Sequence, residues 1–307
     1  MELDTLYPHC IHYVNYPDAA PTPGATTRDG QVVLQSVVDC GDALTVLRDF
    51  PDGSFRTAIT SPPYWSLRDY SVTGQLGLED DPDDYVASLV RIFDEVRRVL
   101  TENGSLWLNI SDSYTSGGRT WRASDKKNPV RAMNTRPPTP EGLKPKELVG
   151  IPWKLAFALQ ASGWYLRSDV IWRKPNAMPE SVKDRPTRSH EYVFFLTKAE
   201  RYFYDTLAVR EQNGRNVRSV WDIYTEALQD VHFATFPTKL VDQCMLLTSK
   251  PGDAVLDPFF GSGTVGVVAI QNQRSFLGIE LNSAYVNVAK RRIGKTHTIF
   301  QQIEEVG

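Results

Sequence analysis

The sequence has few of the residues that hold disulfide-rich or metal-dependent folds together. Of its 307 residues, 3 are cysteine and 5 are histidine. Cys10, Cys40 and Cys244 lie far apart and form neither a CxxC pair nor a zinc-binding spacing. His190 and His232 also lack the spacing of metal ligands. We therefore expect no metal site and no disulfide framework.

Long hydrophobic runs are also missing. No apolar stretch reaches the roughly 18 residues that cross a bilayer, and the first residues lack the basic start and apolar core of a signal peptide. We therefore expect a cytoplasmic protein without membrane contacts. Neither sign of charge dominates, because 34 Lys and Arg face 37 Asp and Glu. A nucleic-acid-binding face would have to come from a local cluster of cations.

The chain does have a regular alternation of short β-rich runs and helical stretches. Expected strands are 31–38, 56–60, 105–110, 165–172, 191–197, 254–257 and 275–280, and expected helices are 43–50, 83–100, 152–162, 239–247, 265–272 and 283–292. This order predicts one α/β domain over 31–300, with a mostly parallel sheet, helices on both faces and one antiparallel strand pair near the edge. Residues 1–30 are expected to form a loosely ordered N-terminal extension.

Two stretches break the alternation. Residues 112–146 contain eight Lys and Arg against three Asp and Glu, with several prolines and glycines. We interpret them as a basic loop that is mobile until a partner binds. Residues 199–231 lack apolar periodicity and are expected to hold a small recognition insert.

A glycine-containing turn follows the predicted strand at 254–257. Asp257 ends that strand, and Gly261 and Gly263 allow close approach of a ligand to the backbone. Glu280 ends the next strand, nineteen residues after Gly261, where an acidic residue can hydrogen-bond ribose hydroxyls. The third glycine of a dinucleotide motif is missing. A nucleoside without phosphates is therefore the better ligand.

A second motif, Ser61-Pro62-Pro63-Tyr64, follows the strand at 56–60. Consecutive prolines lack N–H groups and stiffen the backbone, so the nearby carbonyls can serve as fixed acceptors. Ser61 adds a side-chain acceptor, and Tyr64 and Trp65 offer rings for stacking. Acceptors beside a stacking surface suit a base that carries an exocyclic NH₂ group.

Residues 60–65 and 257–264 together resemble the catalytic and cofactor motifs of the beta-class DNA amino-methyltransferases, with the catalytic motif first, as in that circularly permuted class. Residues 39–44, 172–176, 191–195 and 233–239 resemble further motifs of the class. The resemblance implies a Rossmann-like methyltransferase fold and S-adenosylmethionine as cofactor. It assigns cofactor contacts to Asp42, Phe236, Asp257, Pro258, Phe259, Phe260, Gly261, Ser262, Gly263, Thr264 and Glu280, with Asp42 near the adenine.

The resemblance also indicates the target. Serine in the first position of the catalytic motif is more typical of cytosine-N4 enzymes, and aspartate of adenine-N6 enzymes. Acceptors on the amine N–H bonds would localise its lone pair, and the base would flip out of the duplex to stack on Tyr64. Methylation of cytosine carbon 5 needs a cysteine after a proline, and no cysteine follows a proline here. We therefore expect N4-cytosine methylation of double-stranded DNA.

Candidate DNA contacts are Trp65, Arg68, Lys126, Lys127, Arg131, Arg173 and Lys174. A cognate restriction endonuclease is an expected partner, and the chain could be a monomer or a homodimer. Three other hypotheses remain open: an adenine-N6 enzyme, a methyltransferase for a small molecule or protein side chain, and a non-catalytic nucleic-acid-binding module. Product analysis separates the first from N4 methylation, and a cofactor-binding measurement tests the last.

Overall fold

A computed structural model describes residues 11–15, 26–28, 31–115, 138–210, 214–226 and 236–306. Within these ranges the strands form one ten-stranded sheet in the order β1-β3-β10-β9-β4-β5-β7-β6-β8, with β2 beside β3. The strands are β1 Ile11–Asn15, β2 Thr26–Arg28, β3 Gln31–Cys40, β4 Phe55–Thr60, β5 Leu100–Ile110, β6 Tyr165–Arg173, β7 His190–Thr197, β8 Val220–Asp222, β9 Ala254–Asp257 and β10 Ser275–Glu280.

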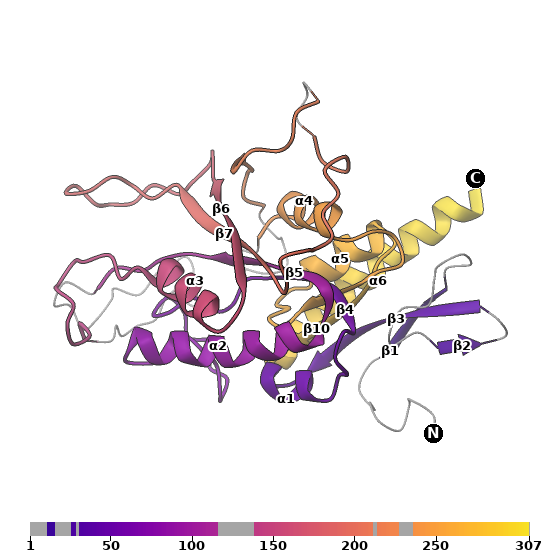
Figure 1. Ribbon diagram of the computed structural model, residues 1–307, viewed down its shortest axis with the longest axis horizontal. Coiled ribbons are helices and arrows are strands. Elements are labelled where there is room, and N and C mark those ends of the chain that lie inside the picture. The colour runs from indigo at the N-terminus through magenta and orange to yellow at the C-terminus, as the bar shows by residue number, and fades with distance from the viewer. Residues whose placement is uncertain are drawn as a thin grey trace.

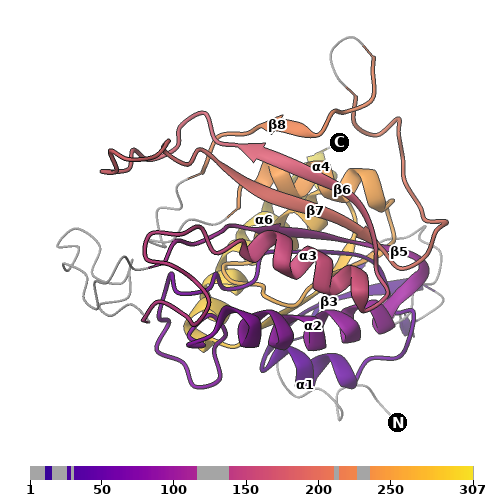
Figure 2. The same ribbon diagram turned by 60° about the vertical axis from the view of Figure 1, so that its left-hand side comes forward.

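Helices cover both faces of the sheet (Figures 1 and 2). They are α1 Ala43–Arg48, α2 Pro82–Val99, α3 Ile151–Ala161, α4 Thr238–Thr248, α5 Thr264–Gln271 and α6 Ser283–Val306. The first three pack into one core and the last three into another. Strand residues alternate between these cores, as Leu106 and Leu108 face the first and Trp107 the second. The predicted α/β fold is therefore confirmed.

The strand directions differ from the sequence-based expectation. Strands β3, β10, β9, β4 and β5 are parallel, but β7 is antiparallel to both β5 and β6, and β1 and β2 are antiparallel to β3. The prediction of one antiparallel pair was therefore wrong. Hydrophobic periodicity reports which face a residue occupies and says nothing about strand direction.

Three short strands were not expected. β1 and β2 lie within residues 1–30 and pair with the long strand β3, and β8 lies within 199–231 and pairs with β6. The loosely ordered extension predicted for 1–30 is thus wrong for these two strands. Such strands are three to five residues long, too short for a periodic signal. No helix in the described ranges is long and apolar enough to cross a membrane.

Direction also determines which loops meet. Parallel neighbours have their carboxyl ends on the same side of a sheet. The turns after β3, β4, β5, β9 and β10 therefore lie together at this edge, which is formed by the strand ends and not by an edge strand. An antiparallel strand brings its beginning to that edge, and β7 begins at His190. This edge carries the site described next.

Candidate active site

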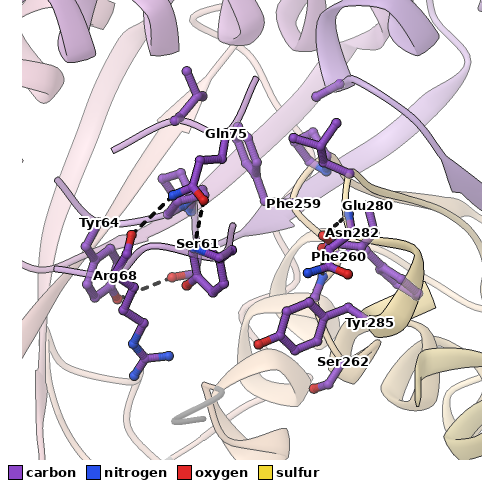
Figure 3. A pocket seen from close by; sticks show the side chains of 18 of the residues that line it. Ser61, Tyr64, Arg68, Gln75, Phe259, Phe260, Ser262, Glu280, Asn282 and Tyr285 are labelled. Carbon is purple, nitrogen blue, oxygen red and sulfur yellow. Dashed lines mark hydrogen bonds between the residues drawn. The ribbon is translucent and has the colours of Figure 1, made fainter. Parts of the chain in front are cut away.

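A cavity of about 270 Å³ opens at this edge (Figure 3). Of the predicted residues, it is lined by Asp42, Ser61, Pro62, Pro63, Tyr64, Arg68, Lys174, Phe236, Pro258, Phe259, Phe260, Gly261, Ser262, Thr264 and Glu280. The catalytic and glycine-containing motifs therefore share one cavity, because β4 and β9 are parallel neighbours. Neither Asp257 nor Gly263 lines it.

Asp257 is fully buried beneath the cavity floor. Its Oδ1 accepts hydrogen bonds from the hydroxyl of Thr60 at 2.6 Å and from the backbone N–H of Phe259 at 3.1 Å. Burial raises the pKa of its carboxyl to about 7. The side chain thus joins the ends of β4 and β9 and does not face a ligand, contrary to its predicted cofactor contact.

The two glycines of the turn have different roles. Gly263 caps α5 with φ +81°, and a Cβ there would lie 2.9 Å from the Cβ of Ala289. It therefore serves the packing of the turn against α6. Gly261 has φ +52°, and a Cβ there would meet nothing nearer than 4.0 Å. Its backbone consequently lies open to the cavity.

Glu280 holds the shape of the same turn. Its Oε2 accepts from the N–H of Gly261 at 2.7 Å and its Oε1 accepts from the N–H of Asn282 at 2.8 Å (Figure 3). Burial raises the pKa of this carboxyl. A carboxylate offers about four acceptor positions, so two bonds leave capacity for ribose hydroxyls. Glu280 can therefore position the loop and bind a nucleoside together.

The catalytic motif is held by residues that follow it in the chain. The hydroxyl of Tyr85 on α2 donates to the carbonyl of Pro63 at 2.7 Å. Among the described residues, no backbone hydrogen bond is made to the carbonyls of Ser61 and Pro62, so these remain available as acceptors near the cavity. Trp65 is only 1% exposed, and its Nε1–H donates to the carbonyl of Glu79 at 2.8 Å. The prediction that Trp65 contacts DNA is therefore wrong, because the ring belongs to the core.

A polar network that sequence reasoning missed surrounds Tyr64. The Tyr64 hydroxyl donates to Oε2 of Glu191 at 2.7 Å, and Nδ2 of Asn109 donates to the same oxygen at 3.0 Å. Lys174 forms an ion pair with the other Glu191 oxygen. Nothing in the sequence marks Asn109, and Glu191 stood out only within the motif at 191–195. These side chains form the wall of the cavity at the end that carries Ser61.

The predicted DNA-contacting cations lie in different places. Lys174 packs over the Trp172 ring at 4.4 Å and lines both this cavity and a second one described below, so its phosphate contact stays a prediction. Arg173 is exposed and ion-paired with Asp222. Arg68 lies in the cavity wall beside Tyr70, whose pKa is raised by burial and lowered in part by this arginine. Lys126, Lys127 and Arg131 lie outside the described residues.

A second, wider cavity of about 1240 Å³ adjoins the first. The two cavities share Tyr64, Leu67, Lys174 and Glu191 in their walls. Lysine and arginine side chains line the wider one, namely Lys146, Lys183, Arg185 and Arg188, together with the carboxylates of Asp112, Glu180 and Asp184. Sequence reasoning missed this cluster, since the residues are spread along a long irregular segment. In the described ranges, no cluster of His, Cys, Asp or Glu could hold a metal ion.

Comparisons with known proteins agree with this geometry. Type II methyltransferase M.Cfr9I from Citrobacter freundii is 62% identical over 257 residues, covering 82% of this chain and 86% of that protein. M.SmaI from Serratia marcescens is 56% identical over 259 residues, covering 82% and 89%. Both relatives are matched over most of their length.

Solved structures share the fold. TTHA0409 from Thermus thermophilus, in complex with S-adenosyl-L-methionine, matches with TM-score 0.62 and 25% identity over 85% of this chain and 94% of that one. The cytosine-N4-specific PvuII DNA methyltransferase matches with TM-score 0.66 and 20% identity over 93% and 96%. The family model described as DNA methylase, for N6 and N4 methyltransferases, matches residues 55–291. The chain therefore belongs to the DNA methylase family and is a DNA methyltransferase of the N6/N4 type.

Proposed function

We propose that this enzyme methylates the exocyclic N4 amine of cytosine at a specific site in duplex DNA. The observation that carries the proposal is the position of Ser61. Its hydroxyl heads the catalytic motif and lines the same cavity as the Gly261 turn. Serine in this position is typical of the cytosine-N4 enzymes that the sequence resembles.

The cavity fits S-adenosylmethionine, the methyl donor of such enzymes. The open backbone at Gly261 admits close contact, and Glu280 has unused acceptor positions for ribose hydroxyls. Asp42 and Phe236 line the same space. The donor supplies a methyl group already activated on a sulfonium, so the protein has mainly to position the amine.

The base-facing end of the cavity can hold and orient that amine. Tyr64 offers a ring for stacking, and Ser61 and the carbonyl of Pro62 offer acceptors for the two N–H bonds. Each bond accepted localises the nitrogen lone pair for attack. Because a duplex hides this amine, the base flips into the cavity through the wider opening beside Lys174 and Glu191.

We assign DNA backbone contacts to the basic wall of the wider cavity and to the loop at 112–146. Lys183 is exposed there with no ion pair among the described residues. Target recognition falls to the insert at about 199–231 within a catalytic domain of 31–300. A cognate restriction endonuclease is the partner expected of a Type II enzyme.

The test is to methylate plasmid DNA with labelled S-adenosylmethionine and identify the modified nucleoside by mass spectrometry. We expect N4-methylcytosine at one short sequence. Detection of N6-methyladenine would overturn the choice of base. Absence of any labelled nucleoside, despite measured binding of the methyl donor, would favour a non-catalytic DNA-binding role.

A further inference from the structure

We propose that Glu191 is the proton acceptor of the reaction, acting on the target amine through the hydroxyls of Tyr64 and Ser61. The inference rests on the proposed function, since it requires an exocyclic amine at Ser61. It adds a positioning residue that does not itself touch the substrate.

The three side chains form a continuous hydrogen-bonded chain. The Ser61 hydroxyl donates to the Tyr64 hydroxyl oxygen at 3.2 Å. The Tyr64 hydroxyl donates to Oε2 of Glu191 at 2.7 Å, and Oδ1 of Asn109 is a longer second acceptor at 3.3 Å. Both donors therefore point away from the substrate end and toward the carboxylate. This direction leaves the Ser61 lone pairs facing the cavity, where they can accept an amine N–H.

The negative charge of Glu191 keeps the hydrogen bonds from Ser61 and Tyr64 directed toward its carboxylate. Burial alone would raise the pKa of Glu191, but the Lys174 ammonium and the bonds from Tyr64 and Asn109 outweigh it, so the pKa is lowered. Burial and the nearby Glu191 raise the pKa of Tyr64 well above its usual value. At neutral pH the chain thus ends in an anion that accepts from a neutral phenol.

The amine must lose one proton, and the relay provides the route. As nitrogen bonds to the methyl carbon, the carbon–sulfur bond breaks and its electron pair stays on sulfur. The methylated amine then gives a proton to the Ser61 oxygen, Ser61 passes its own proton to Tyr64, and Tyr64 passes its proton to Glu191. The neutral carboxyl of Glu191 also lines the wider cavity, where water can take the proton.

The location of Glu191 supports release of the proton to water in the wider cavity. It lies in the shared wall of both cavities, with its side chain 11% exposed. The charged and titratable groups that face it are Lys174, Tyr64 and His190. Burial and Arg188 lower the pKa of His190, so this imidazole is neutral at pH 7 and does not compete as a second cation.

The test is a double-mutant cycle with Glu191→Gln and Tyr64→Phe, measured as the single-turnover rate on duplex DNA. Tyr64→Phe keeps the stacking ring and the Glu191–Lys174 pair but removes the linking hydroxyl. We expect each variant to lower the rate on the order of 10²-fold, as for loss of a general base. The double variant should be no slower than the slower single variant, because either change breaks the same chain. Multiplying losses would overturn the relay.

The pH profile gives a second readout that a structural role would not move. The wild-type rate should fall in acid as Glu191 becomes protonated. Lys174→Met should shift this fall to higher pH, since removal of the cation raises the carboxyl pKa, and Tyr64→Phe should abolish it. An unchanged rate and acid limb in Tyr64→Phe would overturn the relay, even if Glu191→Gln fails to fold.

Binding measurements and product analysis distinguish a failure of the proton relay from a failure of the proposed cytosine-N4 activity. Affinity for S-adenosylmethionine, and the fluorescence of 2-aminopurine at the target position, should remain within about twofold of wild type in Tyr64→Phe. Loss of base flipping would overturn a relay role for the hydroxyl. The product is identified in every assay. N6-methyladenine would overturn the choice of cytosine and leave the relay standing, because the chain serves either amine.

Discussion

The hydroxyl of Thr60 donates a 2.6 Å hydrogen bond to the carboxyl of Asp257 across the two central strands of the sheet. These residues end β4 and β9, immediately before the catalytic motif and the glycine-containing turn. The other oxygen of Asp257 is buried without a hydrogen-bond partner among the described residues. The buried carboxyl therefore fixes the distance between the two loops, and burial raises its pKa to about 7, so its protonation changes near neutral pH.

We expect the free energy of unfolding to decline as pH rises toward about 7. Burial raises the folded-state pKa of Asp257 from 3.8 to about 7. The protonated carboxyl therefore contributes fully to the free energy of unfolding below the unfolded-state pKa, and this contribution is lost as pH rises through the folded-state pKa. The slope should be at most about 1.4 kcal/mol per pH unit. Asp257→Asn should remove this component, as measured by urea denaturation between about pH 5 and about pH 8. An unchanged slope would assign the titration to another group.

Glu280→Ala should weaken the binding of S-adenosylmethionine. The substitution removes both the ribose acceptor and the two backbone bonds that shape the turn at Gly261. Charge-assisted hydrogen bonds contribute about 1.5–3 kcal/mol each, so we expect a loss on the order of 10–100-fold in titration calorimetry. Glu280→Gln keeps the acceptor shape and should lose less. Equal affinity of Glu280→Ala and wild type would remove Glu280 from the site.

Gly77→Ala should impair the catalytic motif. Gly77 has φ +92°, and an added Cβ would lie 2.9 Å from the carbonyl oxygen of Tyr64. The matched control is Gly53→Ala, since Gly53 has φ +73°, open space around its Cβ position and no place in the lining of either cavity. Both variants carry similar backbone strain, of order 1–3 kcal/mol. Only Gly77→Ala should also lower turnover, and equal turnover of the two would show that the close contact relaxes harmlessly.

Ser61→Ala and Tyr64→Ala should affect turnover more than cofactor affinity. Both residues lie at the base-facing end of the cavity, whereas the Gly261 turn forms the other end. Loss of the Tyr64 stack should cost about 1–3 kcal/mol of base binding. Ser61→Ala should remove one acceptor from the amine and leave a folded protein. The assignment fails if both variants retain the full single-turnover rate on duplex DNA.

Replacement of Lys126, Lys127 and Arg131 by Ala should weaken DNA binding and flatten its salt dependence. Each lost phosphate contact should reduce the slope of log affinity against log salt by roughly one unit. Lys183→Ala should behave similarly, because Lys183 lines the wider cavity. Lys250→Ala is the control, since Lys250 precedes β9 and lies at the opposite edge of the sheet. A salt slope equal to that of the control would show that these cations do not contact phosphate.

Local sequence predicted the helices, both motifs and every described strand except β1, β2 and β8. The turn around Gly261 and Gly263 needs small residues with positive φ, and the Ser61 motif needs consecutive prolines, so each is visible in a few adjacent letters. The parallel pairing of β9 with β10 was expected, because the helix α5 connects them. Together these facts predicted that Ser61, Gly261 and Glu280 would share one edge, and they line one cavity.

Only the tertiary structure decided which side chains complete the site. Glu191 reaches the Tyr64 hydroxyl although 127 positions separate them, because β7 runs antiparallel and brings its beginning to the edge where β4 ends. Trp65 and Asp257 look like ligand contacts in the sequence, yet both are buried. The direction of β7 and the burial of Trp65 and Asp257 depend on how distant segments pack together, and a local pattern of residue types carries neither.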